Sequence, residues 1–164
     1  MKKIILFGVL LILMTALVSC NKISFDDDGA FEFYPTEGGY FVAVRDPEDV
    51  KHMEEIEIPY LYKFKPVVGI EEKAFSGCSN LKQITIPSGV ETIGDYAFEG
   101  CESLESITIP DSVTSIGSYA FRYCYSLTNI KYRGTEAEWL AIIKGYRWDG
   151  DPGIYTITYN YDGE

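Results

Sequence analysis

Apolar residues recur along the middle of the chain in a fixed order that repeats every 23 positions. Residues 84–106 read ITIPSGVETIGDYAFEGCESLES, and residues 107–129 read ITIPDSVTSIGSYAFRYCYSLTN. An earlier and longer unit, 56–83, has the same IxIP start, an insertion around residues 60–65, and then the same Ala-Phe-x-x-Cys-x-x-Leu order. One such unit cannot bury its apolar side chains alone, so this period predicts consecutive units that stack on one another.

Within each unit, alternation of apolar and polar residues predicts a short strand. Ile84 and Ile86 alternate with polar residues, so both point to one side of an extended segment. Pro87 then ends the strand because proline has no N–H to donate to a neighbour. A second inward pair and a glycine expected to turn the chain follow in each unit: Val90, Ile93 and Gly94, then Val113, Ile116 and Gly117.

This pattern resembles the BspA-like leucine-rich repeats, whose consensus is an IxIP strand followed by V-x-x-I-G-x-x-A-F-x-x-C-x-x-L. The match covers residues 56–130, and residues 134–139 resemble the segment that closes such arrays. The resemblance implies an α/β, β-rich fold, namely a short right-handed leucine-rich-repeat solenoid. It also implies a secreted or surface-exposed binding protein, because several members of that group are adhesins.

Both ends of a solenoid need a cap over the exposed core. Residues 31–34 and 40–44 are rich in aromatic and β-branched residues and flank a Pro-Thr-Glu-Gly-Gly segment, which predicts an N-terminal β-hairpin cap. We assign residues 31–55 to this cap, 56–129 to the repeats and 130–164 to a C-terminal cap of one helix and one strand, together forming a single domain, 31–164.

The C-terminal cap is predicted from two patterns. Thr135 and Glu138 have the spacing of a capping box, ahead of a helix that we expect to run to about Lys144 and to stop at Gly145. The face of that helix expected to cover the last repeat carries Trp139, Ile142 and Ile143. The strand that follows should place Tyr155, Ile157, Tyr159 and Tyr161 on one face.

The first twenty residues have the pattern of an export signal. Lys2 and Lys3 precede an uncharged apolar run, 4–18, which is too short for a membrane-spanning helix. The run ends in Leu-Val-Ser-Cys, which resembles the lipobox of bacterial lipoproteins and implies cleavage after residue 19 and a lipid on Cys20. An ordinary signal peptide with a chance cysteine is the alternative. Residues 20–30 are then a polar tether, whose Asp26, Asp27 and Asp28 are either solvated linker residues or part of a surface-export signal.

The charge balance excludes some partners. The chain has 14 Lys+Arg against 25 Asp+Glu, a formal net charge of −11. This sign disfavours nucleic acid and anionic lipid surfaces as partners. We therefore expect membrane contact by the lipid anchor only. The resemblance to surface-exposed bacterial lipoproteins implies that this anchor lies in the outer membrane, with the domain exposed at the cell surface.

Three cysteines occupy the same place in consecutive units, at Cys78, Cys101 and Cys124. Equal spacing could indicate a metal site or disulfides. Stacking instead predicts a column of small, buried, reduced side chains, and the resemblance implies that each thiol bonds a neighbouring backbone group. With a single histidine, His52, and no nucleophile or phosphate-binding motif, the sequence indicates no catalytic site, metal or cofactor.

Candidate binding residues are the polar side chains expected on the outer face of the strands. They form two columns, with one arginine just beyond: Glu55, Gln83, Ser106 and Asn129; Glu57, Thr85, Thr108 and Lys131; and Arg133. Tyr119, Tyr123 and Tyr125 occupy positions that the repeat does not obviously bury, and we expect them to join Arg133 at one end of this face.

The predicted function is a non-enzymatic surface lipoprotein that binds a protein or glycoprotein through this face. A glycan-capturing lipoprotein that uses the tyrosines is the alternative, and a structural role in the envelope also stays open.

Overall fold

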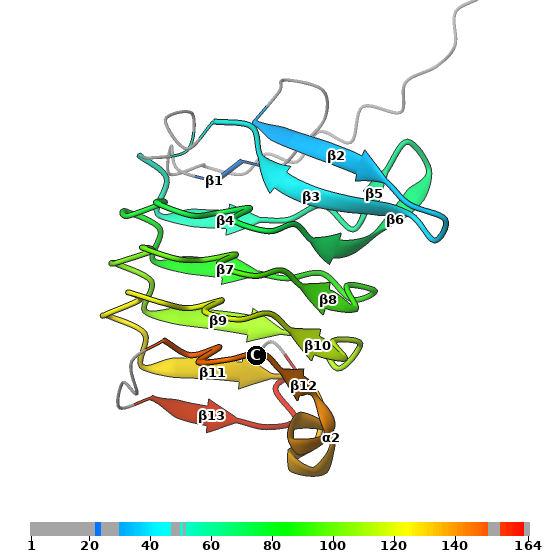
Figure 1. Cartoon of the computed structure of the whole chain (residues 1–164). Coiled ribbons are helices and arrows are strands. Elements are labelled where there is room, and N and C mark those ends of the chain that lie inside the picture. The colour runs from blue at the N-terminus through cyan, green and yellow to red at the C-terminus, as the bar shows by residue number, and fades with distance from the viewer. Residues whose placement is uncertain (1–21, 24–29, 47–49, 51, 151–154, 163–164) are drawn as a thin grey trace, which may run out of the picture.

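The computed structural model describes residues 22–23, 30–46, 50, 52–150 and 155–162. The chain winds through two sheets, and Figure 1 shows the strands of each stacked along one axis. The first sheet is parallel, in the order β1 (Lys22–Ile23), β4 (Glu55–Glu57), β7 (Gln83–Thr85), β9 (Ser106–Ile109), β11 (Asn129–Tyr132) and β13 (Thr156–Thr158).

The second sheet lies along an adjoining side of the solenoid. Its order is β12 (Ile143–Lys144), β10 (Ser115–Ile116), β8 (Thr92–Ile93), β6 (Lys65–Ile70), β3 (Tyr40–Val44) and β2 (Phe31–Pro35). All of these pairs are parallel except β2 with β3, and a short strand, β5 (Leu61–Tyr62), pairs antiparallel with β6. One short helix, α2 (Glu136–Ala141), lies near the C-terminal end. The predicted leucine-rich-repeat solenoid is therefore confirmed.

The 23-residue period becomes the register of the strands. Gln83 lies opposite Ser106, and Ser106 lies opposite Asn129, so each residue pairs with its equivalent in the next turn. Polar side chains follow the same offset, as where the Thr114 hydroxyl donates to the Glu91 carbonyl over 3.2 Å. Because every turn repeats the geometry of the one before it, the backbone groups of the strands find partners without long-range rearrangement.

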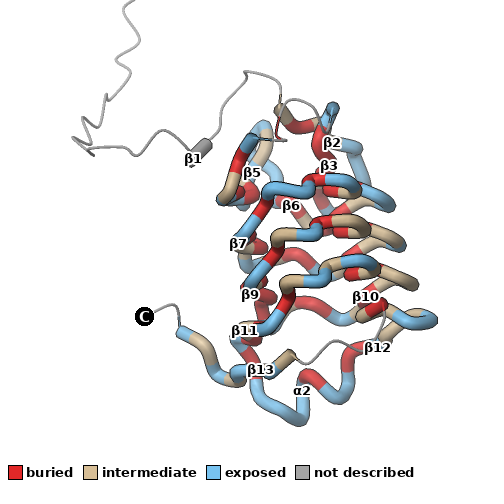
Figure 2. The backbone as a smooth tube through the Cα atoms, turned by 90° about the vertical axis from the view of Figure 1, so that its left-hand side faces the viewer, coloured by how far each residue is buried: buried red, intermediate tan, exposed pale blue. Residues whose placement is uncertain are grey.

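The core runs as a continuous column through the turns. Figure 2 shows the buried positions recurring at the same place in each turn. Phe75, Phe98 and Phe121 stack nearly parallel along this column, with centroids 5.3 Å apart at both steps. The isoleucines predicted to face inward are buried, and so is Tyr132, which takes the place of an isoleucine in the last repeat. Stacked rings at this separation fill the core and fix the distance between turns.

The repeat glycines do not act as we predicted. The backbone at Gly94 and Gly117 is not left-handed, and the positive φ angles fall two residues later, at Tyr96 (56°) and Tyr119 (55°). A Cβ at Gly117 would lie 2.4 Å from the backbone nitrogen of Asp95 in the preceding turn. These glycines are therefore needed for close approach of two turns, and the turning itself is done by the tyrosines.

The N-terminal end is closed by the predicted hairpin, β2–β3, which extends the second sheet through parallel pairing of β3 with β6. The first sheet is closed by β1, where Lys22 pairs with Glu55 and Ile23 with Ile56. These two residues belong to the segment predicted as a tether, so that prediction is wrong for them: their backbone occupies the edge of the sheet, which would otherwise lack a partner.

The C-terminal cap differs from the prediction in its helix. The capping box is confirmed, since the Thr135 hydroxyl accepts from the Glu138 N–H and the Glu138 carboxylate accepts from the Thr135 N–H. The helix, however, ends at Ala141, and the next residues form β12, which pairs with β10. Trp139 and Ile142 are buried as predicted, but Ile143 is 74% exposed. β-branched Ile142 and Ile143 favour extended backbone, and pairing with β10 decides their conformation.

Gly145 has the packing role of Gly117 rather than that of a helix stop. Its N–H donates to the Ile116 carbonyl over 2.8 Å, as the N–H of Gly117 does to Ile93. A Cβ at Gly145 would lie 2.4 Å from the Ser118 nitrogen. Residues 143–150 therefore add a partial turn that the sequence pattern had not indicated.

Candidate functional site

The structure tests where each predicted outward residue lies. Among these residues, Glu55, Glu57, Gln83 and Arg133 are exposed, while Thr85, Ser106, Asn129 and Lys131 are half-buried. Thr108 was predicted to face solvent and is buried, with 5% of its surface exposed. Its side chain is short and lies on β9, which is paired on both sides, with Thr85 and Lys131 as direct neighbours. Thr108 is therefore removed from the candidate binding residues.

A groove of about 540 Å³ lies where β4 and β7 end. Glu57 and Thr85 are on these strands, and Pro59 begins the turn that follows β4. The inserted residues of the first repeat supply one wall, through Tyr60 and Leu61. The groove thus combines two positions predicted on the strand face with two that were not predicted.

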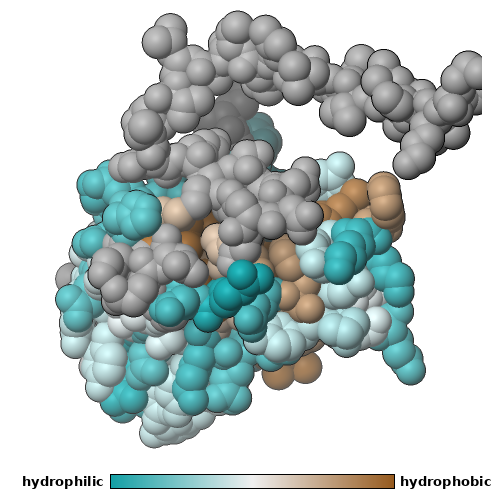
Figure 3. All heavy atoms as spheres, turned by 90° about the horizontal axis from the view of Figure 1, so that it is seen from above, coloured by the Kyte–Doolittle hydropathy of each residue, from teal (hydrophilic) through white to brown (hydrophobic). Residues whose placement is uncertain are grey.

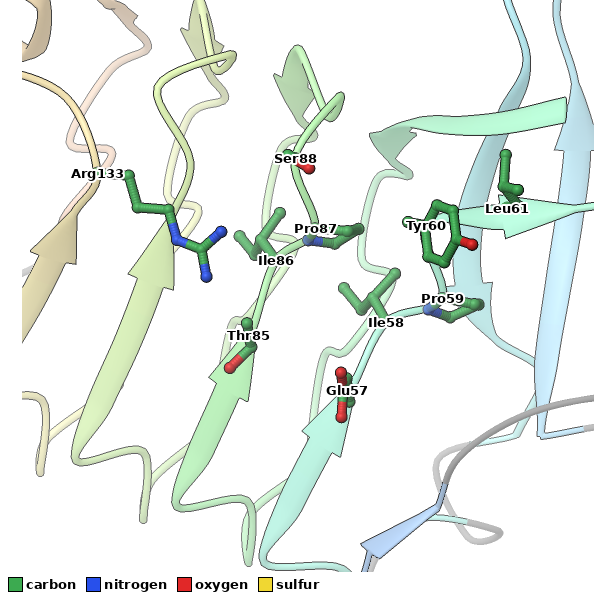
Figure 4. A pocket seen from close by; sticks show the side chains of 10 residues that line it. All are labelled: Glu57, Ile58, Pro59, Tyr60, Leu61, Thr85, Ile86, Pro87, Ser88 and Arg133. Carbon is green, nitrogen blue, oxygen red and sulfur yellow. The ribbon is translucent and has the colours of Figure 1, made fainter. Parts of the chain in front are cut away.

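Arg133 reaches the same groove from the end of β11. Its backbone N–H donates to the Ile109 carbonyl over 3.0 Å, which fixes the chain at this point. Figure 4 shows its side chain on one side of the groove, directed across the strands toward Thr85, with Glu57, Tyr60 and Leu61 on the other side. The groove therefore has a cationic side, an anionic end at Glu57 and an apolar wall.

The apolar wall is accessible to a ligand. Tyr60 is 66% exposed and Leu61 is 42% exposed, although both are large and largely apolar side chains. Large exposed aromatic residues beside charged groups are the composition typical of protein-binding hot spots. An extended chain lying in the groove could place apolar side chains on this wall and polar groups against Arg133.

A second, smaller hollow of about 180 Å³ lies at the turns that follow the second sheet. Its side chains are Tyr96, Tyr119, Arg122, Tyr123 and Arg147. The rings of Tyr96 and Tyr119 stack with centroids 5.3 Å apart. The Arg122 guanidinium carbon lies 5.4 Å from the Tyr119 centroid and 4.3 Å from that of Tyr123, and its Nη1 is 3.3 Å from a Glu99 carboxylate oxygen.

Three tyrosines of this hollow have left-handed backbone. Tyr96, Tyr119 and Tyr123 have φ values of 56°, 55° and 62°, which large residues adopt rarely. Stacking between rings and contact with Arg122 offset part of that cost. The hollow places aromatic rings next to arginine donors, a combination that suits a sugar ring or an anionic group. Arg122 already donates to the Glu99 carboxylate and the Tyr123 hydroxyl, so such a ligand would share or replace these contacts.

The structure does not bring the tyrosines together with Arg133. Tyr123 and Tyr125 precede β11, whereas Arg133 directly follows it. A strand of four residues spans about 13 Å, and the groove and the hollow share no lining residue. The predicted continuous surface of tyrosines and Arg133 is therefore wrong, and the candidate sites are two.

The cysteine column is largely as predicted. Cys78 and Cys101 are buried, and the thiols of Cys101 and Cys124 donate to the Phe75 and Phe98 carbonyls over 3.2 and 3.1 Å. None of the three forms a disulfide within the described residues. Cys124, however, is only half-buried, because no further full repeat follows it. Burial raises the pKa of Cys78 to about 12, and the neighbouring Cys124 thiol, followed by burial, raises the pKa of Cys101.

Within the described ranges, no group of three or more His, Cys, Asp or Glu side chains is placed to hold a metal ion. No helix in the part of the chain that the structure describes is both long and apolar enough to cross a bilayer. The predicted signal, residues 1–19, and the predicted lipid site, Cys20, lie outside the described residues.

Sequence reasoning missed the inserted residues as part of a site. They were recognised as an interruption of the repeat, but no function was attached to Tyr60 or Leu61. The available signal was composition, since the interruption is rich in large apolar residues at a place where the repeat itself needs none.

Comparison with known proteins gives structural neighbours of the same kind. A leucine-rich repeat protein from Bacteroides ovatus is 30% identical and has a TM-score of 0.60, with 84% of this chain and 37% of that chain covered. One from Bacteroides capillosus is 25% identical (TM-score 0.61; 82% and 96% covered), and the T. pallidum leucine-rich repeat protein is 28% identical (TM-score 0.58; 66% and 53% covered). The chain thus spans about half of the T. pallidum chain and less of the B. ovatus chain.

No curated protein matches the chain. A family model does match, in six copies over residues 49–146, which is more than half of the sequence. Leucine-rich repeat proteins typically mediate protein interaction or adhesion, and the fold is typically a non-enzymatic binding module. The repeat register, the buried columns and this match agree: the chain belongs to the family of BspA-type leucine-rich repeat proteins.

Proposed function

We propose that this protein is a non-enzymatic lipoprotein of the cell surface that binds an extended segment of a protein or glycoprotein partner in the groove beside β4 and β7. The observation that carries the proposal is the groove itself, with Arg133 on one side and Tyr60 and Leu61 on the other. In this groove the ends of the stacked strands meet the inserted residues of the first repeat.

The dimensions of the strand face favour an extended ligand over a globular one. The repeat strands of the first sheet are only three or four residues long, so the face is only ~10–13 Å across in the strand direction, whereas a standard protein interface buries about 800 Å² on each partner. A peptide or an extended loop can lie in a groove of about 540 Å³ and still contact both of its sides. Arg133 would bind a carboxylate or a carbonyl of that segment.

The test uses purified extracellular-matrix glycoproteins and a glycan array as probes. Arg133→Glu should weaken binding of a protein probe about tenfold, equivalent to ~1.4 kcal/mol, and salt should weaken the wild-type complex because the contact is exposed. Tyr123→Ala, in the separate hollow, is the control and should leave protein binding unchanged. If neither Arg133→Glu nor a second variant, Tyr60→Ala, changes the affinity for the protein probe, the ligand binds outside the groove.

Glycan capture is the second candidate function, supported by the hollow of tyrosines and arginines. Aromatic faces stack on sugar rings, and the Arg122 guanidinium can donate to hydroxyl groups. In this case Tyr123→Ala should abolish binding on the glycan array with little dependence on salt, and Arg133→Glu should have no effect. The two candidates therefore predict opposite results from the same pair of variants.

The lipid anchor is proposed from the lipobox that ends at Cys20. Acyl chains on this residue would hold the protein in the outer membrane. Cys20→Ser should move the protein from the membrane fraction to the soluble fraction or leave its signal uncleaved. A variant that is processed and fractionates like the wild type would exclude the anchor.

A further inference from the structure

The turn between β5 and β6 carries two residues that its geometry disfavours. Leu61 pairs with Pro66 and Tyr62 with Lys65, so Lys63 and Phe64 form a two-residue hairpin turn. Their φ angles are 48° and 66°. A type I′ turn requires positive φ at both positions, which is why Asn-Gly is preferred there. Lysine followed by phenylalanine is strained in this conformation, and strain of this kind is concentrated at functional sites.

Among the described residues, Phe64 packs against almost nothing that would compensate for this strain. It is 98% exposed, the most exposed of the large hydrophobic residues in the described part of the chain. Lysines stand on both sides of it, and the Lys63 ammonium lies 4.9 Å from the centroid of the Tyr62 ring. The turn thus presents one aromatic ring to the outside between two cationic side chains.

The base of this hairpin is firmly packed, so the exposure of Phe64 is not that of a loose loop. Tyr62 stacks on Phe33 with centroids 3.9 Å apart and meets Tyr40 edge to face at 5.1 Å. The Val67 N–H donates to the Tyr60 carbonyl over 3.0 Å and closes the hairpin at its base. Phe64 is held out from the N-terminal end on a rigid support.

The same end of the solenoid lies next to the proposed lipid anchor. β1 begins at Lys22 and pairs with β4, only two residues after Cys20. Two extended residues span at most ~7 Å, so the acyl chains would hold this end close to the bilayer. Figure 1 shows the β5–β6 turn at this end, beside β2 and β3, and Figure 3, viewed from this end, shows hydrophobic side chains reaching the surface at one side.

We propose that Phe64, with Lys63 and Lys65, is a second membrane contact that inserts into the headgroup region of the bilayer to which Cys20 is anchored. The proposal rests on the lipid anchor of the proposed function. An aromatic residue accompanied by lysines is the composition of membrane interfaces, where the ring is buried and the ammonium groups meet lipid phosphates. The net charge of −11 opposes adsorption of an unanchored protein, but the anchor already holds this end at the surface, and the tip is locally cationic.

A second membrane contact would fix the orientation of the solenoid relative to the bilayer. One anchor permits the solenoid to tilt freely, whereas an anchor at the first sheet and Phe64 beside the second sheet define a base. The solenoid would then stand upright, and the groove with Arg133 would face sideways, open to an approaching partner.

The experiment uses the lipidated protein in vesicles of phosphatidylethanolamine and phosphatidylglycerol. Phe64→Trp should give fluorescence, relative to wild type, that shifts to shorter wavelength on vesicle binding and loses intensity when the lipids carry bromine in the upper acyl chain. Tyr125→Trp, at an exposed position far along the chain, is the matched control and should show neither change.

Each outcome decides one point. Protein that does not float with the vesicles excludes the anchor and with it the second contact. Protein that floats while the tryptophan at position 64 stays water-exposed keeps the anchor and overturns the second contact. Iodide quenching, measured in parallel, gives a third outcome: a tryptophan shielded from iodide but not quenched by brominated lipid indicates contact with a second copy of the chain and also overturns the membrane contact.

A stability measurement separates a functional turn from a structural one. Replacing Lys63→Asn and Phe64→Gly together gives the sequence that a type I′ turn prefers. The double variant should melt at a higher temperature than wild type in detergent, because the strain is removed. A lower melting temperature would show that Phe64 contributes to the fold and would overturn the argument from strain.

Discussion

Replacing Gly117 with alanine adds one methyl group at a point where two turns of the solenoid touch. The added Cβ would lie 2.4 Å from the Asp95 nitrogen and 2.5 Å from the Gly94 carbonyl carbon. Both are backbone atoms of the preceding turn, so moving the Asp95 side chain, whose Oδ1 would also lie 2.5 Å away, cannot relieve the clash. The two turns would have to separate locally.

Separation would also stretch the hydrogen bonds that join them. The Gly117 N–H donates to the Ile93 carbonyl over 2.8 Å, and the Ser118 N–H donates to the Asp95 carboxylate over 2.6 Å. Overpacking costs about 1–3 kcal/mol, and each weakened hydrogen bond adds up to ~1 kcal/mol. Gly117→Ala should therefore lower the free energy of unfolding by about 3 kcal/mol, measured by urea denaturation followed by circular dichroism.

Two other glycines provide matched controls. Gly77 has a φ of 80° and open space around its Cβ position, so Gly77→Ala has only the backbone cost of about 1–2 kcal/mol. Gly38 has open space and no positive φ, so Gly38→Ala should be neutral within ~0.5 kcal/mol. The loss in free energy of unfolding on substitution by alanine should therefore be largest at Gly117, smaller at Gly77 and smallest at Gly38.

Asparagine distinguishes packing from conformation. It adopts positive φ more readily than alanine, so Gly77→Asn should cost less than Gly77→Ala. At Gly117 the larger side chain should cost more than alanine. The packing argument is refuted if Gly117→Ala falls within ~0.5 kcal/mol of Gly38→Ala, or if asparagine is better tolerated than alanine at position 117.

Three further predictions concern the thiols and the C-terminal cap. Thiol-specific labelling of the native protein at pH 8 should be fast at Cys124 and slow at Cys78 and Cys101, because the latter two are buried and have raised pKa values; fast native labelling of Cys101 would contradict the column. Trp139→Ala should cost ~3–5 kcal/mol in urea denaturation, since its ring packs against Tyr132 at 5.2 Å and is buried. Hydrogen bonds from the N–H and then the hydroxyl of Thr135 lower the pKa of Glu138 from its ordinary value of 4.5. The Glu138 carboxylate should therefore stabilise the fold above pH 4.5, and this contribution should be lost as the pH falls through the lowered pKa of the folded protein. Glu138→Gln should remove this pH dependence of stability, and a variant with the same pH profile as wild type would exclude the contribution.

Most of the fold could be predicted because the same order of inward-facing apolar residues occurs in three consecutive units. Ile84 and Ile107 occupy equivalent positions, and each confirms the inward direction of the other. The hairpin at 31–44 and the Thr135 capping box were also predictable, since both depend on residues close together in sequence.

The features that the sequence did not predict depend on contacts between different turns of the solenoid. The end of α2 at Ala141 is set by pairing of β12 with β10, two elements 27 residues apart at their nearest ends, and helical periodicity cannot reveal it. Burial of Thr108 depends on two flanking strands, and the role of Gly117 depends on the position of Asp95. The groove required the same information, because Tyr60 and Arg133 are brought together only by the winding of the chain.

The common offset of 23 residues between paired strands also has a genetic consequence. Each turn contacts the turn before and the turn after it through equivalent atoms, as Gln83, Ser106 and Asn129 do. An in-frame duplication of one unit would therefore add a turn whose two faces already fit their neighbours, without altering either cap. Length in such a protein can therefore change one turn at a time by unequal recombination. The wall formed by Tyr60 and Leu61 would stay unchanged, whereas each added turn would move Arg133, which follows the last repeat, further from that wall.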